Sequence, residues 1–151
     1  MAPRITLRIQ SEPFDTAHEI ALLSAGGDDA GAVTSFVGLC RSENGRLKAL
    51  ELEHYPGMAD EEIARVVAEA ETRWPLDGVT VIHRVGKIAP GARIVLVVTA
   101  SAHRAAAFAG AEFLMDYLKT RAPFWKLEER GAGSTWVEAR STDDESAKRW
   151  R

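Results

Sequence analysis

The 151-residue chain has little of several features that would define its class. It contains one cysteine, Cys40, which excludes an internal disulfide framework and any zinc or iron–sulfur site built from several cysteines. Its longest strongly apolar run, residues 94–100, is far shorter than the roughly 20 residues that span a bilayer. Residues 1–10 alternate polar and apolar side chains and include two arginines, so we expect no secretory signal and a cytoplasmic protein.

Common catalytic and metal-binding motifs are also missing from the sequence. It has no Walker A loop, no GxGxxG and no GxSxG, which argues against the common nucleotide-binding folds and serine hydrolases. The four histidines do not show metal-ligand spacing, so we expect no metal site. The net charge of −3 excludes a polycation built to bind nucleic acid.

The charge is unevenly distributed along the chain. Residues 1–75 carry 7 basic and 13 acidic side chains, whereas residues 76–151 carry 12 basic and 9 acidic ones. If the protein binds an anion, we expect the binding groups mainly in the second half.

The hydrophobic pattern predicts a single α+β domain over residues 1–151, with a largely antiparallel sheet and a C-terminal tail at residues 142–151. The predicted strands are residues 5–9, 32–39, 50–53, 79–85, 94–99, 124–128 and 135–139. The predicted helices are a short one capped by Asp15, an amphipathic one at about residues 60–74, a long one at about residues 103–121, and a helical tail from Asp143.

The start of the long helix is one candidate site. Ser101 is a suitable N-cap and would place His103 and Arg104 in the first turn, beside the free backbone N–H groups. Together these groups would bind an anion, phosphate in particular. The alternative is that both side chains point into solvent.

The other end of the same helix is a second candidate site. Pro123 ends the helix between Lys119 and Lys126, so the two ammonium groups could converge, with Met115 one turn earlier. Two adjacent lysines disfavour double protonation, which yields a usable base or nucleophile. The alternative is that Lys119 complements the helix C-terminus and pairs with Asp116, while Lys126 faces solvent.

The two candidate sites are far apart on one helix. Arg104 and Lys119 are separated by about 22 Å along an α-helix. One small-molecule pocket would therefore need two copies of the chain to use both ends, so the anion-site interpretation predicts a homodimer.

Five segments occur together in one order and spacing, and through them the chain closely resembles the molybdopterin synthase catalytic (large) subunit family. The resemblance covers about residues 31–150. Its segments are LEHYPGM at 52–58, VIHRVG at 81–86, SAHR at 101–104, MDYLKTRAPFWK at 115–126 and WVEAR at 136–140.

The resemblance implies a sulfurtransferase of molybdenum cofactor biosynthesis that converts precursor Z, a cyclic pyranopterin monophosphate, to molybdopterin. Each of two sulfurs would arrive as a thiocarboxylate on the C-terminal glycine of a small ubiquitin-like subunit. The implied assembly is a homodimer of large subunits within a heterotetramer. The implied fold is an α/β hammerhead-type fold with an added small β subdomain, and no cofactor of its own is implied.

The resemblance also implies roles for individual residues. Lys119 and Lys126 match the catalytic lysines of the family. The implied substrate-binding residues are Arg41, His103, Arg104, Arg140, Phe36 and Met115, with the second protomer donating the anion-binding group. Two other interpretations remain: a non-catalytic scaffold that docks a ubiquitin-like protein, and a phosphate-binding hydrolase that acts alone.

Overall fold

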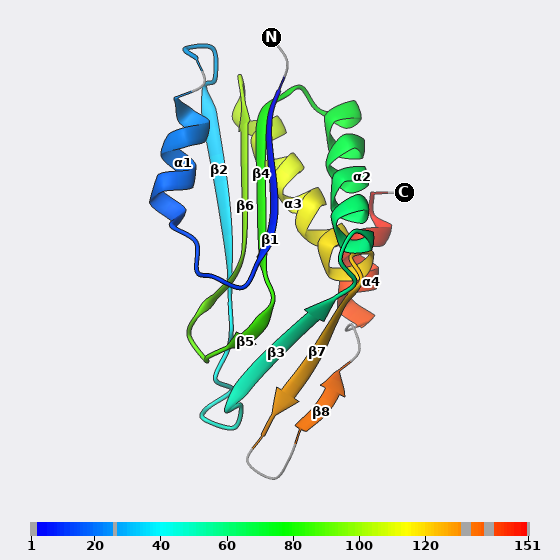
Figure 1. Cartoon of the computed structure of the whole chain (residues 1–151). Helices are drawn as coiled ribbons and strands as arrows, with labels where there is room; N and C mark the ends of the chain where they lie inside the picture. Colours follow the sequence, from blue (N-terminus) through cyan, green and yellow to red (C-terminus); the bar gives the residue numbers. More distant parts are fainter. Residues whose placement is uncertain (1–2, 26, 131–133, 138–140, 151) are drawn as a thin grey trace.

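The computed structural model describes residues 3–25, 27–130, 134–137 and 141–150. Two sheets form the framework, and helices cover both faces of one of them (Figure 1). The elements follow in the order β1 (Arg4–Gln10), α1 (Thr16–Ser24), β2 (Ala32–Leu39), β3 (Ala49–His54), α2 (Met58–Arg73), β4 (Leu76–Arg84), β5 (Gly86–Ile88), β6 (Arg93–Ser101), α3 (Arg104–Thr120), β7 (Phe124–Glu129), β8 (Ser134–Val137) and α4 (Ser141–Lys148).

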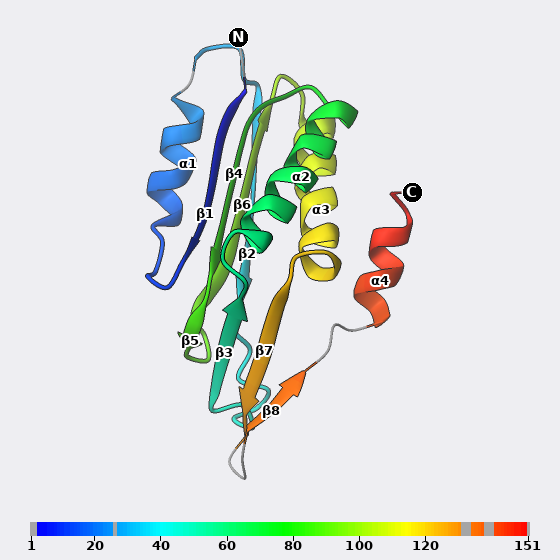
Figure 2. The same cartoon turned by 45° about the vertical axis from the view of Figure 1, so that its right-hand side comes forward.

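The first sheet, called sheet A here, has the strand order β1-β4-β6-β2. β1 pairs with β4 in parallel, and the other pairs are antiparallel. The second sheet, sheet B, has the order β5-β3-β7-β8 and is antiparallel throughout its described pairs. Figure 2 shows sheet B extending from one end of sheet A, below α2 and α3.

The main core lies on both faces of sheet A. α1 packs on one face, while α2 and α3 pack on the other (Figure 1). Strands buried on both faces read as continuous apolar runs rather than alternating ones, which explains residues 94–100. Alternate residues of β4 and β6 face the two layers: Val79, Val81, Val95 and Val97 lie on the α2–α3 side, and Ile82, Leu96 and Val98 on the α1 side.

The amphipathic helix α2 buries the face that its 3.6-residue period predicts. Ile63, Val66 and Ala70 on this face are each at most 3% exposed. Gly57 precedes the helix with φ of +85°, a conformation that favours glycine. Its N–H donates to the Asp60 carboxylate at 3.0 Å, so an acidic side chain in the first turn caps the helix.

The helical tail expected from Asp143 is present as α4, which packs against α3 (Figure 2). The Trp150 ring meets Trp74 edge to face at 5.5 Å and Phe113 at 5.7 Å between ring centroids. Arg149 pairs with Glu112 of α3 at 2.7 Å. The end of the chain is therefore fastened along the middle of α3.

The predicted α+β class with largely antiparallel pairing is confirmed, and sheet B corresponds to the added β subdomain. The three-residue strand β5 was not predicted, and β4 begins at Leu76 rather than Val79. Residues 138 and 139 of the last predicted strand lie outside the described residues. In the part of the chain that the structure describes, no helix is both long and apolar enough to cross a membrane.

Candidate active site

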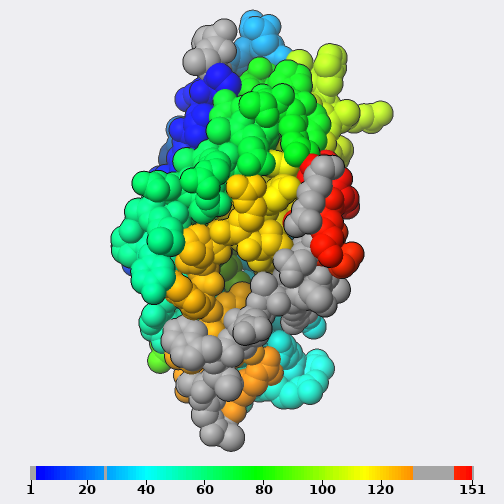
Figure 3. Space-filling view, turned by 90° about the vertical axis from the view of Figure 1, so that its right-hand side faces the viewer, coloured from blue at the N-terminus to red at the C-terminus, as the bar shows by residue number. Residues whose placement is uncertain are grey.

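A cavity of about 340 Å³ lies where sheet A, sheet B and the C-terminal end of α3 meet. Its size falls within the range of about 300–1,000 Å³ that is typical of small-molecule sites. Five of the predicted site residues line it: Phe36, Arg41, Met115, Lys119 and Lys126. Figure 3 shows the face on which β7, in orange, lies beside the C-terminal part of α3, in yellow.

The two lysines reach this cavity from successive elements. Lys119 is in the last turn of α3. The chain then turns at Pro123 into β7, where Lys126 pairs in register with Leu52 of β3. Both side chains line the same cavity, so the convergence expected from the position of Pro123 is present.

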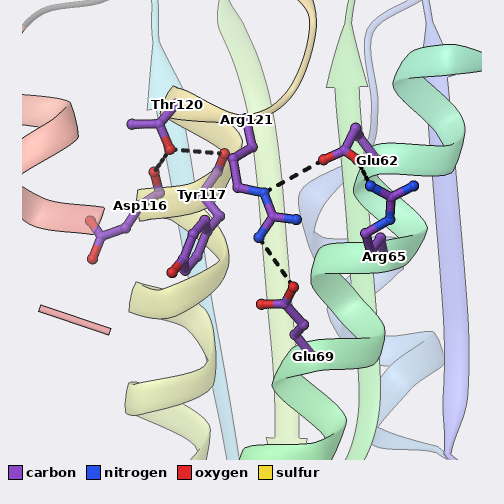
Figure 4. A network of polar contacts seen from close by, with 7 residues as sticks. All are labelled: Glu62, Arg65, Glu69, Asp116, Tyr117, Thr120 and Arg121. Atoms are coloured by element: carbon purple, nitrogen blue, oxygen red, sulfur yellow. Dashed lines mark hydrogen bonds and ion pairs between the residues drawn. The ribbon is translucent and has the colours of Figure 1, made fainter. Parts of the chain in front are cut away.

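The C-terminal end of α3 is braced against α2 by Arg121 (Figure 4). The Arg121 guanidinium lies 3.1 Å from the Glu69 carboxylate and 3.6 Å from that of Glu62. The guanidinium also lies 5.0 Å from the centroid of the Tyr117 ring. The backbone N–H of Arg121 donates a hydrogen bond to the backbone carbonyl of Tyr117 at 2.7 Å. These contacts fix the helix end that carries Lys119.

Asp116, the suggested partner of Lys119, has other interactions. Its carboxylate accepts hydrogen bonds from Arg149 at 2.8 and 3.1 Å and from the Trp150 indole N–H. The pKa of Arg149 is raised, first by its hydrogen bond to Asp116. Asp116 therefore fastens α4 to α3 one turn before the lysine.

Arg41 opens the exposed loop that connects β2 to β3. Glu43 and Asn44 in this loop have φ values of 54° and 60°, the left-handed region. This conformation accompanies an ion pair between Glu43 and Arg130. Arg130 also donates to the Glu128 carboxylate at 2.6 and 3.0 Å, and both glutamates raise its pKa. The Arg130 latch, defined as these pairs with Glu43 and Glu128, ties the loop to β7.

An apolar cluster floors the cavity. It includes Leu50 and Leu52 of β3 together with Cys40, each at most 4% exposed. The pKa of the Cys40 thiol is raised, mainly by burial and then by Glu128, while Lys126 acts in the opposite direction. The thiol is therefore neutral at physiological pH, as expected for a packing residue rather than a nucleophile.

The N-terminal end of α3 differs from the prediction. Ser101 is not the N-cap: it is the buried last residue of β6, and its hydroxyl donates to the Pro75 carbonyl at 2.7 Å. His103 occupies the N-cap position without a side-chain capping bond, and Arg104 is the first helical residue. Both are exposed and neither lines the cavity. The predicted site residue Arg140 lies outside the described residues.

His83 and Glu128 line the cavity, but the sequence patterns gave neither a role. His83 directly follows the buried run of β4, and Glu128 stands two residues after Lys126 on the same face of β7. That i, i+2 spacing was an available signal for Glu128. For His83, only the contact between the two sheets reveals that it lines the cavity.

The side chains of the cavity suit binding of an anion and proton transfer. Arg41, Lys119 and Lys126 supply positive charge and hydrogen-bond donors over an apolar floor, where such groups stabilise a developing oxyanion. Among the described residues, no group of three or more His, Cys, Asp or Glu side chains is placed to hold a metal ion.

Comparison with known proteins identifies the family. The family model of the MoaE protein matches residues 9–121, about three quarters of the chain. This chain belongs to the MoaE family. A molybdopterin synthase catalytic subunit from Mesorhizobium japonicum is 66% identical to it, over 97% of this chain and 93% of the relative. One from Brucella melitensis is 54% identical, over 97% of this chain and 91% of the relative.

Solved MoaE-like structures share the same fold. The molybdopterin biosynthesis MoaE protein from Burkholderia ambifaria has a TM-score of 0.84 and 48% identity, over 99% of this chain and 98% of that chain. A molybdopterin synthase chain from Staphylococcus aureus has a TM-score of 0.79 and 29% identity, over 86% of this chain and 95% of that chain. A chain from the complex of subunits 1 and 2 of the Helicobacter pylori molybdopterin-converting factor has a TM-score of 0.74, over 89% of this chain and 92% of that chain. Because its identity is 22%, this likeness shows the shared fold alone.

Proposed function

We propose that this chain is the catalytic subunit of a molybdopterin synthase, a cytoplasmic sulfurtransferase that converts precursor Z to molybdopterin. Each of the two sulfurs is delivered as a thiocarboxylate on the C-terminal glycine of a small ubiquitin-like subunit. The observation that carries the proposal is the convergence of Lys119, Lys126 and Arg41 on one cavity. Membership of the MoaE family and the names of its relatives support it.

The lysines act on the thioester that forms when the thiocarboxylate sulfur bonds to a side-chain carbon of the pterin and the carbon–oxygen bond at that carbon breaks, its oxygen leaving. Water attacks the thioester carbonyl carbon, so a carbon–oxygen bond forms and a tetrahedral oxyanion develops. One lysine, as the amine, accepts the proton from water, while the other, as the ammonium, stabilises the oxyanion. The carbon–sulfur bond then breaks, which leaves sulfur on the pterin and a carboxylate on the partner. Lys119 is assigned the position nearest the incoming glycine.

The phosphate of precursor Z is assigned to the N-terminal end of α3. His103 and Arg104 are exposed there beside free backbone N–H groups, which favour an anion. Because about 22 Å of helix separates Arg104 from Lys119, the His103–Arg104 pair of one copy serves the cavity of a second copy. Arg140 is proposed to join this anion-binding group. The proposed assembly is a homodimer of this chain with a small subunit at each end.

Three incubations test the proposed function. The purified chain is mixed with precursor Z alone, with precursor Z and a small subunit that ends in an ordinary carboxylate, and with precursor Z and the thiocarboxylated small subunit. Molybdopterin is quantified in each mixture. We expect product only in the third, because the thiocarboxylate is the sulfur source.

The other outcomes identify the alternative functions. Partner binding without product in any mixture would support a docking scaffold instead of an enzyme. Turnover of precursor Z without a partner would support a phosphate-binding hydrolase that acts alone.

A further inference from the structure

His83 lies between the two sheets at the wall of the lysine cavity. Its ring stacks on the Phe124 ring, with 4.0 Å between centroids and 12° between planes. His83 belongs to β4 of sheet A, whereas Phe124 begins β7 of sheet B, two residues before Lys126. The stack therefore sets the position of the imidazole relative to the strand that carries one catalytic lysine.

The hydrogen bonds of His83 define which ring nitrogen carries the proton. Nδ1 lies 2.8 Å from the carbonyl oxygen of Arg84. A carbonyl oxygen only accepts, so Nδ1 donates its proton and Nε2 of the neutral ring keeps a lone pair. The Nε2 lone pair points to the opposite side of the ring, where it can accept a hydrogen bond. The ring thus provides a hydrogen-bond acceptor in a cavity where the other basic groups are donors.

The surroundings of His83 keep its ring neutral. Burial lowers the pKa of His83 to about 4, and the hydrogen bond to the Arg84 carbonyl opposes this only in part. Lys119 from α3, Lys126 from β7 and His54 from β3 each lower it further. At neutral pH the imidazole therefore adds no positive charge to a cavity that already holds Arg41 and the two lysines.

We propose that His83 is a positioning residue for the lysine pair: its Nε2 accepts a hydrogen bond that orients the Lys119 ammonium toward the reacting carbonyl. The Phe124 stack and the Arg84 carbonyl hold the ring in place for this purpose. The role rests on the proposed function, because it requires that the lysines act on a thioester in this cavity.

Two variants separate an orienting role from a merely structural one. His83→Phe keeps an aromatic ring for the Phe124 stack but removes both nitrogens. His83→Gln loses the stack but places an amide oxygen near the position of Nε2. We expect His83→Phe to lower kcat about 10- to 100-fold, as for loss of a hydrogen bond to a charged group. We expect His83→Gln to retain more activity than His83→Phe, and both to bind the small subunit like the wild type.

The pH dependence of kcat distinguishes an orienting role from a packing role. Loss of a residue that only packs would leave this pH dependence unchanged. An acceptor beside an ammonium group stabilises the charged form, so its loss lowers the pKa of that lysine. The alkaline limb of the profile should therefore shift to lower pH in His83→Phe. His54→Phe is the matched control: His54 lies 6.2 Å from the same Phe124 ring but does not line the cavity, and its replacement should leave kcat unchanged.

Several results would overturn the proposal. If the wild type is active and His83→Phe has wild-type kcat and pH profile, His83 does not orient the lysine. If His83→Gln is the more impaired variant, the stack alone matters. Nitrogen NMR of the wild-type imidazole is independent of activity and of variant folding: we expect Nδ1 protonated and Nε2 unprotonated at neutral pH. A protonated Nε2 would contradict the proposal. Failure of the wild type to form molybdopterin would instead refute the proposed function and leave the NMR result readable.

Discussion

The two ends of α3 differ in how completely one copy of the chain surrounds them. At the C-terminal end, Lys119 faces a cavity walled by both sheets, and Arg121 braces the helix against α2. At the N-terminal end, His103 and Arg104 are exposed, and Phe108 one turn later is 62% exposed. One copy of the chain thus encloses the cavity at one end of α3 by itself and leaves the other end of the helix exposed.

Removing a cavity lysine should have the largest effect of all. We expect Lys119→Ala to lower kcat by about 10²- to 10⁴-fold, because it removes a group that transfers a proton or stabilises the oxyanion. Lys126→Ala should act in the same direction. The measurement is single-turnover formation of molybdopterin with the thiocarboxylated partner.

The matched control for these variants is Lys87→Ala. Lys87 lies on β5 and is exposed, but it does not line the lysine cavity. It should retain wild-type kcat. Activity of Lys119→Ala near that of the wild type would contradict the catalytic assignment.

The burial of His83 in the cavity at the C-terminal end of α3 should also affect how the stability of the protein depends on pH. His83 has a pKa of about 4 in the folded chain against an ordinary value of 6.5, so the unfolded chain binds its proton more readily between these values. The free energy of unfolding should therefore fall as the pH is lowered from 6.5 to 4, by up to about 3 kcal/mol from this group. Urea unfolding at several pH values measures it.

The contribution of His83 is isolated by repeating the series on His83→Phe. This variant lacks the titrating ring, so its stability should depend less steeply on pH within the same window. Equal slopes for the variant and the wild type would show that His83 is not enclosed as described.

Arg104→Ala tests the open end of α3. We expect it to weaken binding of precursor Z about 10-fold, because a charge-assisted hydrogen bond to the phosphate is lost. Binding of the small subunit should be unchanged. Calorimetry measures both affinities. The control is Arg93→Ala, which removes an exposed arginine elsewhere on the protein. Equal loss of both affinities would count against a phosphate-binding role.

Mixed dimers sharpen the comparison between the two ends. If Arg104 of one copy serves the cavity of the other, a dimer of one Lys119→Ala chain and one Arg104→Ala chain retains one intact site. At precursor Z concentrations far below saturation, an equimolar mixture should then show about one quarter of wild-type activity, because half of the dimers are mixed and each has one intact site of two. Isolated mixed dimers no more active per Lys119 site than the Arg104→Ala dimer would show that the two groups do not meet across copies.

The smallest effect is expected from loosening the loop that carries Arg41. Arg130→Ala removes the Arg130 latch to Glu43 and Glu128. Because exposed ion pairs contribute little, we expect amide exchange in residues 42–47 to accelerate only about two- to five-fold. Arg65→Ala, which removes an exposed ion pair on α2, should leave exchange in this loop unchanged. Loop exchange at the wild-type rate in Arg130→Ala would show that the latch does not hold the loop.

The parts of the fold that follow from local patterns were predictable. The 3.6-residue period gave the buried face of α2, and the continuous apolar run gave β6. Ser101 shows where such reasoning fails, because the serine that looks like a cap bonds instead to Pro75, 26 residues earlier in the chain. β5 was missed because three residues of Gly-Lys-Ile contain no period to detect.

The site was predictable only in part for the same reason. Pro123 indicated that Lys119 and Lys126 could converge, and the family resemblance added Arg41 and Phe36. His83 lines the cavity because the two sheets meet there, and no local sequence pattern encodes that contact. The family resemblance includes the segment at 81–86 that contains His83, but it implied no role for this residue.

The pairing of strands distant in sequence also has a consequence for how the protein folds. β1 must find β4, with Arg4 opposite Gly78, and β3 must find β7, with Ala49 opposite Glu129. Such non-local pairings require large loops to close and slow the search for the native state. On the ribosome, Lys126 cannot lie beside Lys119 until β7 has emerged and paired with β3, so the lysine cavity is among the last features to form.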